Sequence, residues 1–515
     1  MLKNIRTILA AVVFAGITLL FMGIGHDWWG WLAKLQFLPA LFRLTAGAIG
    51  MNLLVVAGIL LLTFIFGRIY CSVICPLGIM QDLVLWIRRK IYPLFHKNPK
   101  TGKGRKFSLE FTTENRMLRY SVFALYVICI IAGIQVLIAF LAPYSAYGRM
   151  IRSLASLWVT GAYEGPAAVQ TMSLSVIAIV TFAVITVIAA VSGRGWCNSI
   201  CPVGTFLSFF SRFSLFRPVI DKDACTGCRS CEKKCRARCI DVASRSIDYS
   251  RCVDCFECID SCPKHGLKYK FVKPGTMATA SCAPCKPASG PVKASDSSEK
   301  QAPSEGRRAF IQGAVLAIGA AAVGEVNSFA QDVKLDGGFA DVQPKKNPER
   351  AEKVVPFGAR GVKNFYSKCT ACQLCVAACP NGVLRPSTDL KHLMQPEMGF
   401  ENGYCRPECT ACSQVCPAGA ILPVTKEEKT AIHIGLATVN LDLCVVRRDN
   451  VDCGNCSRHC PAGAIVMVRD EKTGKRIPTV NESQCIGCGA CENLCPSRPI
   501  SAIHVDGLNR HITKA

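Results

Sequence analysis

The cysteines carry the strongest chemical signal in this sequence. Of its 32 cysteines, 24 fall into six groups of four, in which Cys-x-x-Cys steps recur and most groups end in Cys-Pro. Bacterial ferredoxins hold 4Fe-4S clusters with this spacing of three close thiolates and a fourth. Zinc also accepts four cysteines, but its sites seldom repeat this spacing. The cysteines therefore predict six iron–sulfur clusters with four irons each.

The first two groups have the spacing of a two-cluster ferredoxin, in which the fourth cysteine of each group reaches across to the other cluster. We expect residues 216–271 to form this domain. Cys235 is its unusual member, because Arg236 replaces the proline that normally follows and Cys239 offers an alternative ligand nearby. The expected ligands of the first cluster are Cys225, Cys228, Cys231 and Cys262, and those of the second are Cys252, Cys255, Cys258 and Cys235.

Four further groups fill the last part of the chain, residues 363–515, with little apolar sequence between them to build a core. The fold of this block must therefore depend heavily on its clusters. Its third group has a wider first interval, because eight residues separate the first two cysteines. The ligands expected here are Cys369, Cys372, Cys375, Cys379, Cys405, Cys409, Cys412, Cys416, Cys444, Cys453, Cys456, Cys460, Cys485, Cys488, Cys491 and Cys495.

Another four cysteines belong to a repeated phrase. Gly-Arg-x-aromatic-Cys-x3-Cys-Pro occurs twice, with its thiols at Cys71, Cys75, Cys197 and Cys201. Four converging thiols could exchange electrons as disulfides or bind a metal, and buried structural thiols are the alternative. The adjacent Arg68 and Arg194 favour the ionised, reactive form of a thiol. We therefore predict one redox or metal site here, as the candidate catalytic centre of the chain.

Each copy of this phrase follows an apolar segment that is long enough to span a bilayer, which takes about 20 residues. Half of the residues are hydrophobic and the mean hydropathy is +0.28, which is too apolar for an ordinary soluble protein. The sequence therefore predicts a four-helix membrane domain over residues 1–215. Its expected spans, each free of charged residues, are Ile8–Ile24, Leu44–Phe66, Tyr120–Ala142 and Thr171–Val191.

Charge sets the expected orientation of these spans. The loop between the second and third spans is rich in lysine and arginine, so the positive-inside rule predicts that it is cytoplasmic. Four crossings then return the chain to the cytoplasm before the two-cluster domain. His26, Trp28, Trp29 and Trp31 fall at the opposite interface, where an aromatic belt is expected and a quinone site is the alternative.

A stretch near residue 306 resembles a twin-arginine export signal. Arg307 and Arg308 precede Phe310, a weakly apolar run and a small-x-small sequence ending at Ala330. The alternative is a basic pair before an ordinary helix. Polar linkers, residues 272–305 and 331–362, flank residues 306–330, which could be cleaved or remain as a fifth span. The blocks before and after this signal are therefore predicted to occupy different compartments.

Several function classes find no support in the sequence. The formal net charge is +24, but no basic face with groove-reading or base-stacking motifs accompanies it, so nucleic acid is not an expected partner. Haem-binding Cys-x-x-Cys-His, dinucleotide-binding Gly-x-Gly-x-x-Gly and phosphate-loop motifs are absent. The chain therefore has the features of an electron relay and not of a terminal catalyst.

Residues 1 to about 270 resemble the NapH-type membrane ferredoxin of periplasmic nitrate reductase systems, and residues 306 to about 506 resemble its NapG-type partner. The resemblance rests on the four spans, the Cys-x3-Cys-Pro repeat, the export signal and the order of the cysteine groups. It implies a multidomain fold, in which an α-helical membrane bundle is joined to α+β ferredoxin-like iron–sulfur domains. The fusion of two usually separate proteins is the departure from the family pattern.

The resemblance also implies a place and a function. The place is the bacterial inner membrane, with the two-cluster domain in the cytoplasm and the residues after about 330 in the periplasm. The function is that of an electron-transfer component of a quinol dehydrogenase. Quinol is the implied donor, six 4Fe-4S clusters are the relay, and a periplasmic reductase or cytochrome is the acceptor, in a nitrate-reductase-like system. An assembly or regulatory polyferredoxin that supports maturation of a metalloenzyme is the alternative.

Analogy with related four-cluster subunits implies how the motifs of the last block share their ligands. The outer motifs should pair with each other, and the inner two likewise. Cys379 would then join the cluster of Cys485, and Cys495 would join that of Cys369. Cys416 and Cys460 would cross in the same way.

Overall fold

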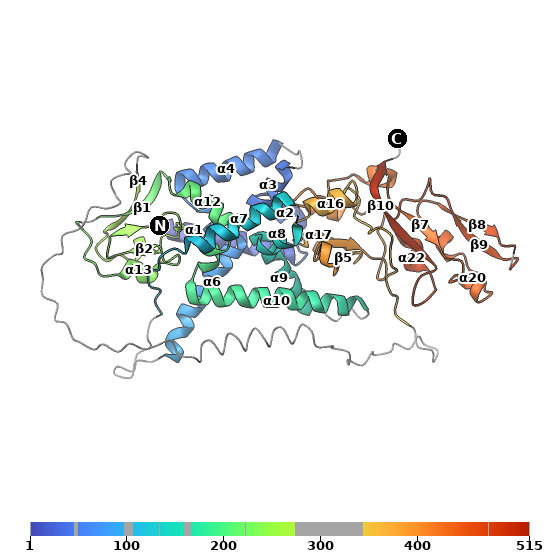
Figure 1. Ribbon diagram of the computed structural model, residues 1–515, viewed down its shortest axis with the longest axis horizontal. Helices are drawn as coiled ribbons and strands as arrows, with labels where there is room; N and C mark the ends of the chain where they lie inside the picture. The colour runs from blue at the N-terminus through green and yellow to red at the C-terminus, as the bar shows by residue number, and fades with distance from the viewer. Residues whose placement is uncertain are drawn as a thin grey trace. The chain divides into compact units, whose positions relative to one another are not determined.

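The computed structural model describes residues 2–45, 50–96, 107–132, 134–158, 166–221, 223–272, 343–471 and 473–513 (Figure 1). Residues up to 274 and from 344 onward form one compact unit. The export-like segment 306–330 and nearly all of the linker 272–305 lie outside the described residues.

Helices build the first part of the chain. Proline begins several of them, including α6 and α12, because a proline at the first helical position has no amide hydrogen to leave unpaired. The helices are α1 Leu2–Phe21, α2 His26–Lys34, α3 Phe37–Thr45, α4 Gly50–Phe66, α5 Tyr70–Val73, α6 Pro76–Phe95, α7 Arg116–Ala132, α8 Gln135–Leu141, α9 Pro143–Trp158, α10 Pro166–Ser192, α11 Gly195–Ser199 and α12 Pro202–Ser211.

The expected bundle of four spans is not supported by helix length. Within the described residues only α1 is both long and apolar enough to cross a membrane. Helix α4 and Val176–Ser192, the part of α10 whose side chains are described, are apolar but shorter. The expected third span, Tyr120–Ala142, is divided, because α7 ends at Ala132 and α8 begins at Gln135. Hydropathy alone located the apolar segments but not these helix ends.

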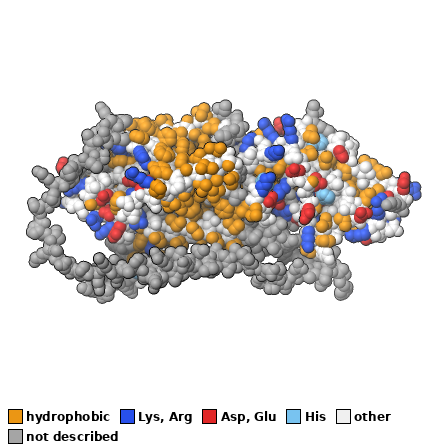
Figure 2. Space-filling view, in the orientation of Figure 1, with side chains coloured by type: hydrophobic (Ala, Val, Ile, Leu, Met, Phe, Trp, Pro, Cys, Tyr) orange, Lys and Arg blue, Asp and Glu red, His pale blue; other side chains and the backbone are white. Residues whose placement is uncertain are grey.

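The apolar helices nevertheless carry large side chains on their exposed surfaces, and Figure 2 shows a broad apolar area over the helical part. The exposed fraction is 64% for Ile8 on α1, 68% for Leu54 on α4, 82% for Ile131 on α7 and 60% for Val187 on α10. Soluble monomers rarely expose apolar patches of large extent. An apolar environment or partner is therefore expected around these helices.

The two-cluster domain follows the helices. Strand β1 Phe216–Ile220 pairs antiparallel with β4 Leu267–Phe271, so that the two ends of the domain lie side by side. Between them, β2 Ile240–Asp241 pairs with β3 Ser246–Ile247. The short helices α13 Ser230–Lys234 and α14 Glu257–Asp260 pack on each other and carry cysteines of the two groups.

The last block repeats this plan with short helices and two-stranded sheets. Its antiparallel pairs are β5 Leu384–Pro386 with β6 Pro396–Met398, β7 Ile432–Val439 with β10 Ile503–Thr513, and β8 Ile465–Arg469 with β9 Arg476–Val480. Its helices are α16 Val362–Lys368, α17 Leu374–Ala378, η2 Leu390–His392, α18 Ala411–Val415, α19 Lys426–Ala431, α20 Val445–Arg448, α21 Asn455–Arg458 and α22 Ala490–Leu494.

The end of the expected linker 331–362 packs onto this block. Val354 and Phe357 are buried in its core, at 0% and 2% exposure. Arg350 forms an ion pair with the buried Glu492, with 2.6 Å between Nη2 and Oε1. The compact unit therefore begins again near residue 344, before the boundary expected from composition.

Candidate metal centres

The structure brings together the first expected set of four thiols. One pocket at the two-cluster domain is lined by Cys225, Cys228, Cys231 and Cys262. Three of these cysteines come from the loop before α13 and from the start of that helix, and Cys262 returns from the second group. The four thiols therefore lie where the crossed ligation expected from the spacing requires them.

The second set includes an additional thiol. Burial raises the pKa of Cys258 well above its ordinary value, and the neighbouring Cys255, Cys252 and Cys235 raise it further. Such thiols lose their protons when a metal binds. Cys252 and Cys255 interact electrostatically with Cys235 as well, so Cys235 lies close to all three cysteines expected to share its cluster. Cys239 lies beside it, with 3.6 Å between the two sulfur atoms, so the alternative ligand named from the sequence is close to the same site.

The last block contains four more sets. Cys405, Cys409 and Cys412 line a pocket with Cys379. A second pocket is lined by Cys444, Cys453, Cys456 and Cys495, and a third by Cys460, Cys485, Cys488 and Cys491. The remaining set comprises Cys369, Cys372, Cys375 and Cys416, whose thiols interact electrostatically.

The pairing of motifs expected by analogy is wrong in this structure. Cys379 lies with the Cys405 set and not with the Cys485 set, and Cys495 lies with the Cys444 set. The first motif therefore pairs with the second, and the third with the fourth. The physical reason is helix packing, because α17 contacts α18 and α21 contacts α22. Each consecutive pair of motifs thus has the arrangement of a two-cluster ferredoxin.

Single-ion sites are not formed by these sets. Within the described ranges, no group of three or more Cys, His, Asp or Glu side chains is close enough to hold one metal ion. A pocket lined by four thiols suits a group larger than a single ion, such as an iron–sulfur cluster. The geometry therefore fits 4Fe-4S ligation better than the zinc alternative.

Lys429 is a functional candidate that the sequence did not reveal. Its ammonium nitrogen lies 3.2 Å from the sulfur of Cys405 and donates to the carbonyl oxygens of Arg406 and Cys409, at 2.6 and 2.5 Å. The side chain is 2% exposed and lies over the ring of Phe357. Net charge and hydrogen bonds around a cluster set its potential. Lys429 therefore places a positive charge where it favours the reduced form.

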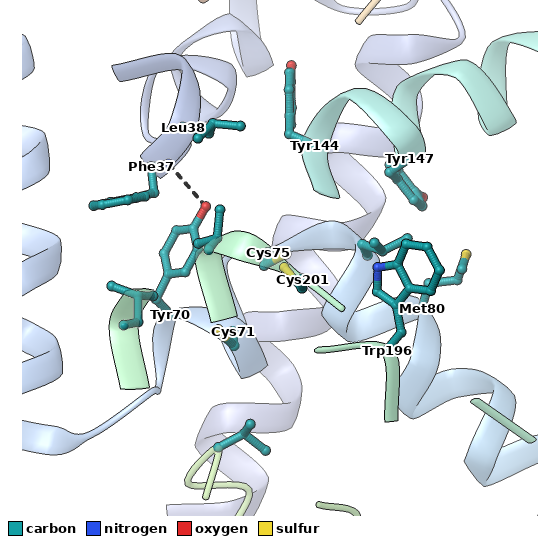
Figure 3. Close-up of a cluster of buried hydrophobic side chains, with 14 of the residues drawn as sticks. Phe37, Leu38, Tyr70, Cys71, Cys75, Met80, Tyr144, Tyr147, Trp196 and Cys201 are labelled. Atoms are coloured by element: carbon teal, nitrogen blue, oxygen red, sulfur yellow. Dashed lines mark hydrogen bonds between the residues drawn. The ribbon is translucent and has the colours of Figure 1, made fainter. Parts of the chain in front are cut away.

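The repeated Cys-x3-Cys-Pro phrases also meet. Their four cysteines are each 4% exposed, and each thiol interacts electrostatically with others of the set. Figure 3 shows Cys71, Cys75 and Cys201 within one buried cluster. Cys75 and Cys201 are the N-cap residues of α6 and α12, and the proline after each begins the helix. The four thiols predicted as one site are therefore neighbours.

The two phrases bind each other through their arginines. Arg194 of the second copy donates to the carbonyl oxygen of Cys71 at 2.7 Å, and Arg68 of the first donates to that of Cys197 at 3.3 Å. Both arginines are buried, at 1% and 0% exposure. Gln81 adds a hydrogen bond to the sulfur of Cys197, at 3.1 Å. These reciprocal hydrogen bonds join the two copies into one site.

Asp82 is a second residue that the sequence did not single out. Its carboxylate pairs with Arg194 at 2.7 Å, Arg236 at 2.8 Å and Arg6 at 3.2 Å. Burial by itself raises the pKa of Asp82, but the charges of Arg194 and Arg236 outweigh it and hold the pKa well below its usual range. Asp82 therefore stays ionised and ties the four-thiol site to the two-cluster domain.

Comparisons with known proteins agree with the cysteine chemistry. A family described as a 4Fe-4S dicluster domain matches residues 368–445 and 451–498, and one described as a 4Fe-4S binding domain matches residues 49–93 and 174–220. The ferredoxin-type protein NapF of Escherichia coli is 32% identical over 180 residues, which are 35% of this chain and 100% of NapF. The chain belongs to the ferredoxin-type 4Fe-4S proteins.

Other relatives of this ferredoxin-type protein cover different fractions of it. The methylamine utilization ferredoxin-type protein MauM of Methylophilus methylotrophus is 31% identical over 157 residues, or 29% of this chain and 69% of MauM. An uncharacterized protein of Methanocaldococcus jannaschii, MJ0749, is 28% identical over 212 residues, or 41% and 67% of the two chains. No solved structure matches. The family matches and the named relatives together show an iron–sulfur electron-transfer protein of the ferredoxin type. The more specific resemblance to NapH and NapG stays a prediction.

Proposed function

We propose that this ferredoxin-type protein is bound in a membrane and relays electrons from quinol, through its clusters, to a reductase on the periplasmic side. The proposal includes the four crossings expected from hydropathy, in which the shorter apolar helices also lie in lipid. The acceptor is proposed to be a nitrate-reductase-like system, as the NapH and NapG resemblance implies. The single observation that carries the membrane role is the exposed apolar surface of α1, α4, α7 and α10.

Lipid is the environment that suits this surface. Transfer of apolar area from water is favourable by about 25 cal/mol per Å², and the exposed side chains of these helices would gain it in a bilayer. Trp28 and Trp31 on α2 are 81% and 55% exposed, directly after α1. Exposed tryptophans at the end of a span are typical of the membrane interface, which supports the aromatic belt more than a quinone site.

Contacts of α1 support a relay across the membrane. At its start, Lys3 pairs with Asp260 of the two-cluster domain at 3.2 Å. Just after its end, Gly23 lies against the carbonyl oxygen of Ala377 in the last block. A helix of 20 residues is about 30 Å long, which is close to the hydrocarbon thickness of a bilayer. The two cluster-bearing blocks thus contact opposite ends of one candidate span.

Quinol is the donor best suited to such a protein. The sequence has no dinucleotide-binding motif, and a lipid-soluble donor reaches a protein within the bilayer directly. A relay also differs in a measurable way from an assembly factor. Steady-state electron flow needs the relay at every turnover, whereas an assembly factor is dispensable once its partner enzyme is complete.

The test uses the full chain, loaded with clusters and placed in liposomes with a reduced naphthoquinone. Cluster reduction is followed by electron paramagnetic resonance, and dithionite reports the total that can be reduced. We expect quinol to reduce clusters of both blocks. Clusters that respond to dithionite but never to quinol would contradict the proposal. Flux to a preassembled acceptor that continues without the protein would favour the assembly role.

A further inference from the structure

Neither copy of the repeated phrase has enough cysteines to hold an iron–sulfur cluster alone. The family described as a 4Fe-4S binding domain matches each copy separately, and each match contains two cysteines of the repeat. The fold places both pairs at one buried site. We propose that Cys71, Cys75, Cys197 and Cys201 together bind a further iron–sulfur cluster, the seventh of the chain, shared between the two copies.

The local structure presents all four thiols to one place. In each copy the first cysteine lies on a short helix, α5 or α11, and the second caps the following helix. The N-terminus of a helix stabilises negative charge, and at α12 the backbone N–H of Gly204 donates to the sulfur of Cys201 at 3.4 Å. This contact offsets part of the cost that burial places on a thiolate. The same construction in both copies gives the cluster two equivalent pairs of ligands.

The buried charges favour an anion at this position. Arg194, Arg236 and Arg6 share the single carboxylate of Asp82, although Arg236 also pairs with Glu257. The guanidinium of Arg68 forms no close ion pair in the described part of the chain, although the buried carboxyl group of Asp254 interacts with it electrostatically. An unpaired buried charge is costly. A cluster held by four thiolates is an anion, and it would add negative charge beside Arg68 and Arg194.

Arg68 itself points to a ligand in the site. Its hydrogen-bond partners are neutral, namely Asn198 and the carbonyl oxygens of Ser250 and Cys197, and one terminal nitrogen lies 3.9 Å from the sulfur of Cys71. Among the described residues, its Nε has no acceptor. Buried donors normally have partners. Sulfur atoms of a cluster would be acceptors for the terminal nitrogen that already lies beside Cys71.

A second orphaned donor lies on α7. The hydroxyl of Tyr126 is buried without a partner in the described residues, and the side chain interacts electrostatically with Cys201. Helix α7 packs against both α11 and α12. Plain structural thiols, which behave as small apolar groups, would need neither arginines nor orphaned donors around them. The surroundings therefore suit a polar, negatively charged occupant.

The proposed cluster would lie between two of the expected ones. Towards the two-cluster domain, Arg236 follows the ligand Cys235 and meets Arg194 at Asp82. Towards the last block, Tyr70 interacts with Cys75, and Tyr144 interacts with both Tyr70 and Cys372. The proposed site thus lies between expected clusters of the two blocks, whatever the identity of the electron donor.

Iron counting tests this proposal without any activity assay. The full chain, reconstituted anaerobically with iron and sulfide, should bind about 28 iron atoms, because seven clusters of four irons are expected instead of six. The variants Cys75→Ala and Cys201→Ala each remove one ligand from a different copy. Each should lose about four irons and the same paramagnetic signal.

Cys129→Ala is the matched control, because Cys129 is equally buried, on α7, and belongs to no expected ligand set. It should keep the full iron content. A wild-type count of about 24, or variants that keep every iron and signal, would overturn the proposal and leave the thiols structural. Where a variant fails to fold, the wild-type iron count alone decides between seven clusters and six.

Discussion

The buried carboxylate of Asp82 pairs with three arginines from different parts of the chain. It joins Arg6 from α1, Arg194 from the second Cys-x3-Cys-Pro phrase and Arg236 from the two-cluster domain. Removal of one partner from a buried ion pair leaves the others uncompensated, which typically costs about 3–5 kcal/mol. Three arginines depend on Asp82, so its loss should exceed the effect of any surface pair.

We therefore expect Asp82→Asn to destabilise the loaded protein by about 3–5 kcal/mol, read as earlier loss of cluster absorbance in a urea titration. Asp260→Asn is the control, because Asp260 pairs with Lys3 on the surface, where ion pairs contribute about 0–1 kcal/mol. Equal effects of the two substitutions would show that the three arginines find other partners.

Lys429 gives a prediction about potential. Reduction adds negative charge to a cluster, and a buried ammonium beside Cys405 stabilises that charge. At an effective dielectric constant of about 20, loss of one charge a few Å away corresponds to a shift on the order of 100 mV. Lys429→Met should therefore lower the potential of the cluster held by Cys379, Cys405, Cys409 and Cys412.

A redox titration followed by paramagnetic resonance measures this shift. Lys426→Met is the control, because Lys426 begins the same helix, α19, and is exposed to solvent. It should leave the potential nearly unchanged, since exposed charges are screened. A rise in potential, or equal shifts in both variants, would contradict the assigned role of Lys429.

At the scale of elements, the two copies of the phrase pack closely because each has a glycine where a side chain would not fit. A Cβ atom on Gly78 of α6 would overlap the carbonyl oxygen of Cys71 and lie 2.6 Å from Arg194. On Gly204 of α12 it would overlap the carbonyl oxygen of Cys197 and lie 2.7 Å from Arg68. The glycines therefore let each arginine reach the other copy.

Gly78→Ala and Gly204→Ala should thus cost similar amounts, about 1–3 kcal/mol each, as overpacked buried sites do. Gly58→Ala on α4 is the control, because its Cβ would meet nothing within 4 Å, and alanine favours a helix. The fraction of chain recovered with full iron content measures the effect. Tolerance of alanine at Gly78 but not at Gly204 would contradict the equivalence of the copies.

Local spacing explains what could be predicted from the sequence. Three ligands of most expected clusters lie within a few residues, so a single loop and short helix place them, as with Cys225, Cys228 and Cys231. The fourth ligand depends on which helices pack together, and the contact of α17 with α18 is a tertiary choice that spacing does not encode. Lys429 and Asp82 were missed for the same reason, because their partners are distant in sequence.

Hydropathy had a similar limit. It located apolar segments such as Tyr120–Ala142, but α7 ends at Ala132 and α8 begins only at Gln135 within that expected third span. Composition likewise extended the linker to residue 362, although Val354 is fully buried. In both cases the sequence shows the average hydropathy or composition of a segment. The tertiary packing that determines where the segment ends is not visible in it.

At the scale of the whole molecule, α1 links the two cluster-bearing blocks. Lys3 contacts the two-cluster domain, while Arg43, on α3 beyond the other end of α1, donates to the carbonyl oxygen of Cys416 at 2.9 Å. An export signal between the two blocks would be needed only if the blocks occupy different compartments. The arginine pair Arg307 and Arg308, between the blocks in sequence, is the feature expected to send the last block across the membrane.

A reporter that works only outside the cytoplasm tests this topology. Fused after Val362 it should be active, and fused after Lys268 it should be inactive. Arg307→Lys combined with Arg308→Lys keeps the charge but removes the arginine pair, so it should abolish activity of the first fusion. The control is Lys300→Arg, which also keeps the charge but lies outside the pair, so both fusions should be unchanged. If both fusions report the cytoplasm, the two blocks share a compartment, and the electrons need not cross the membrane.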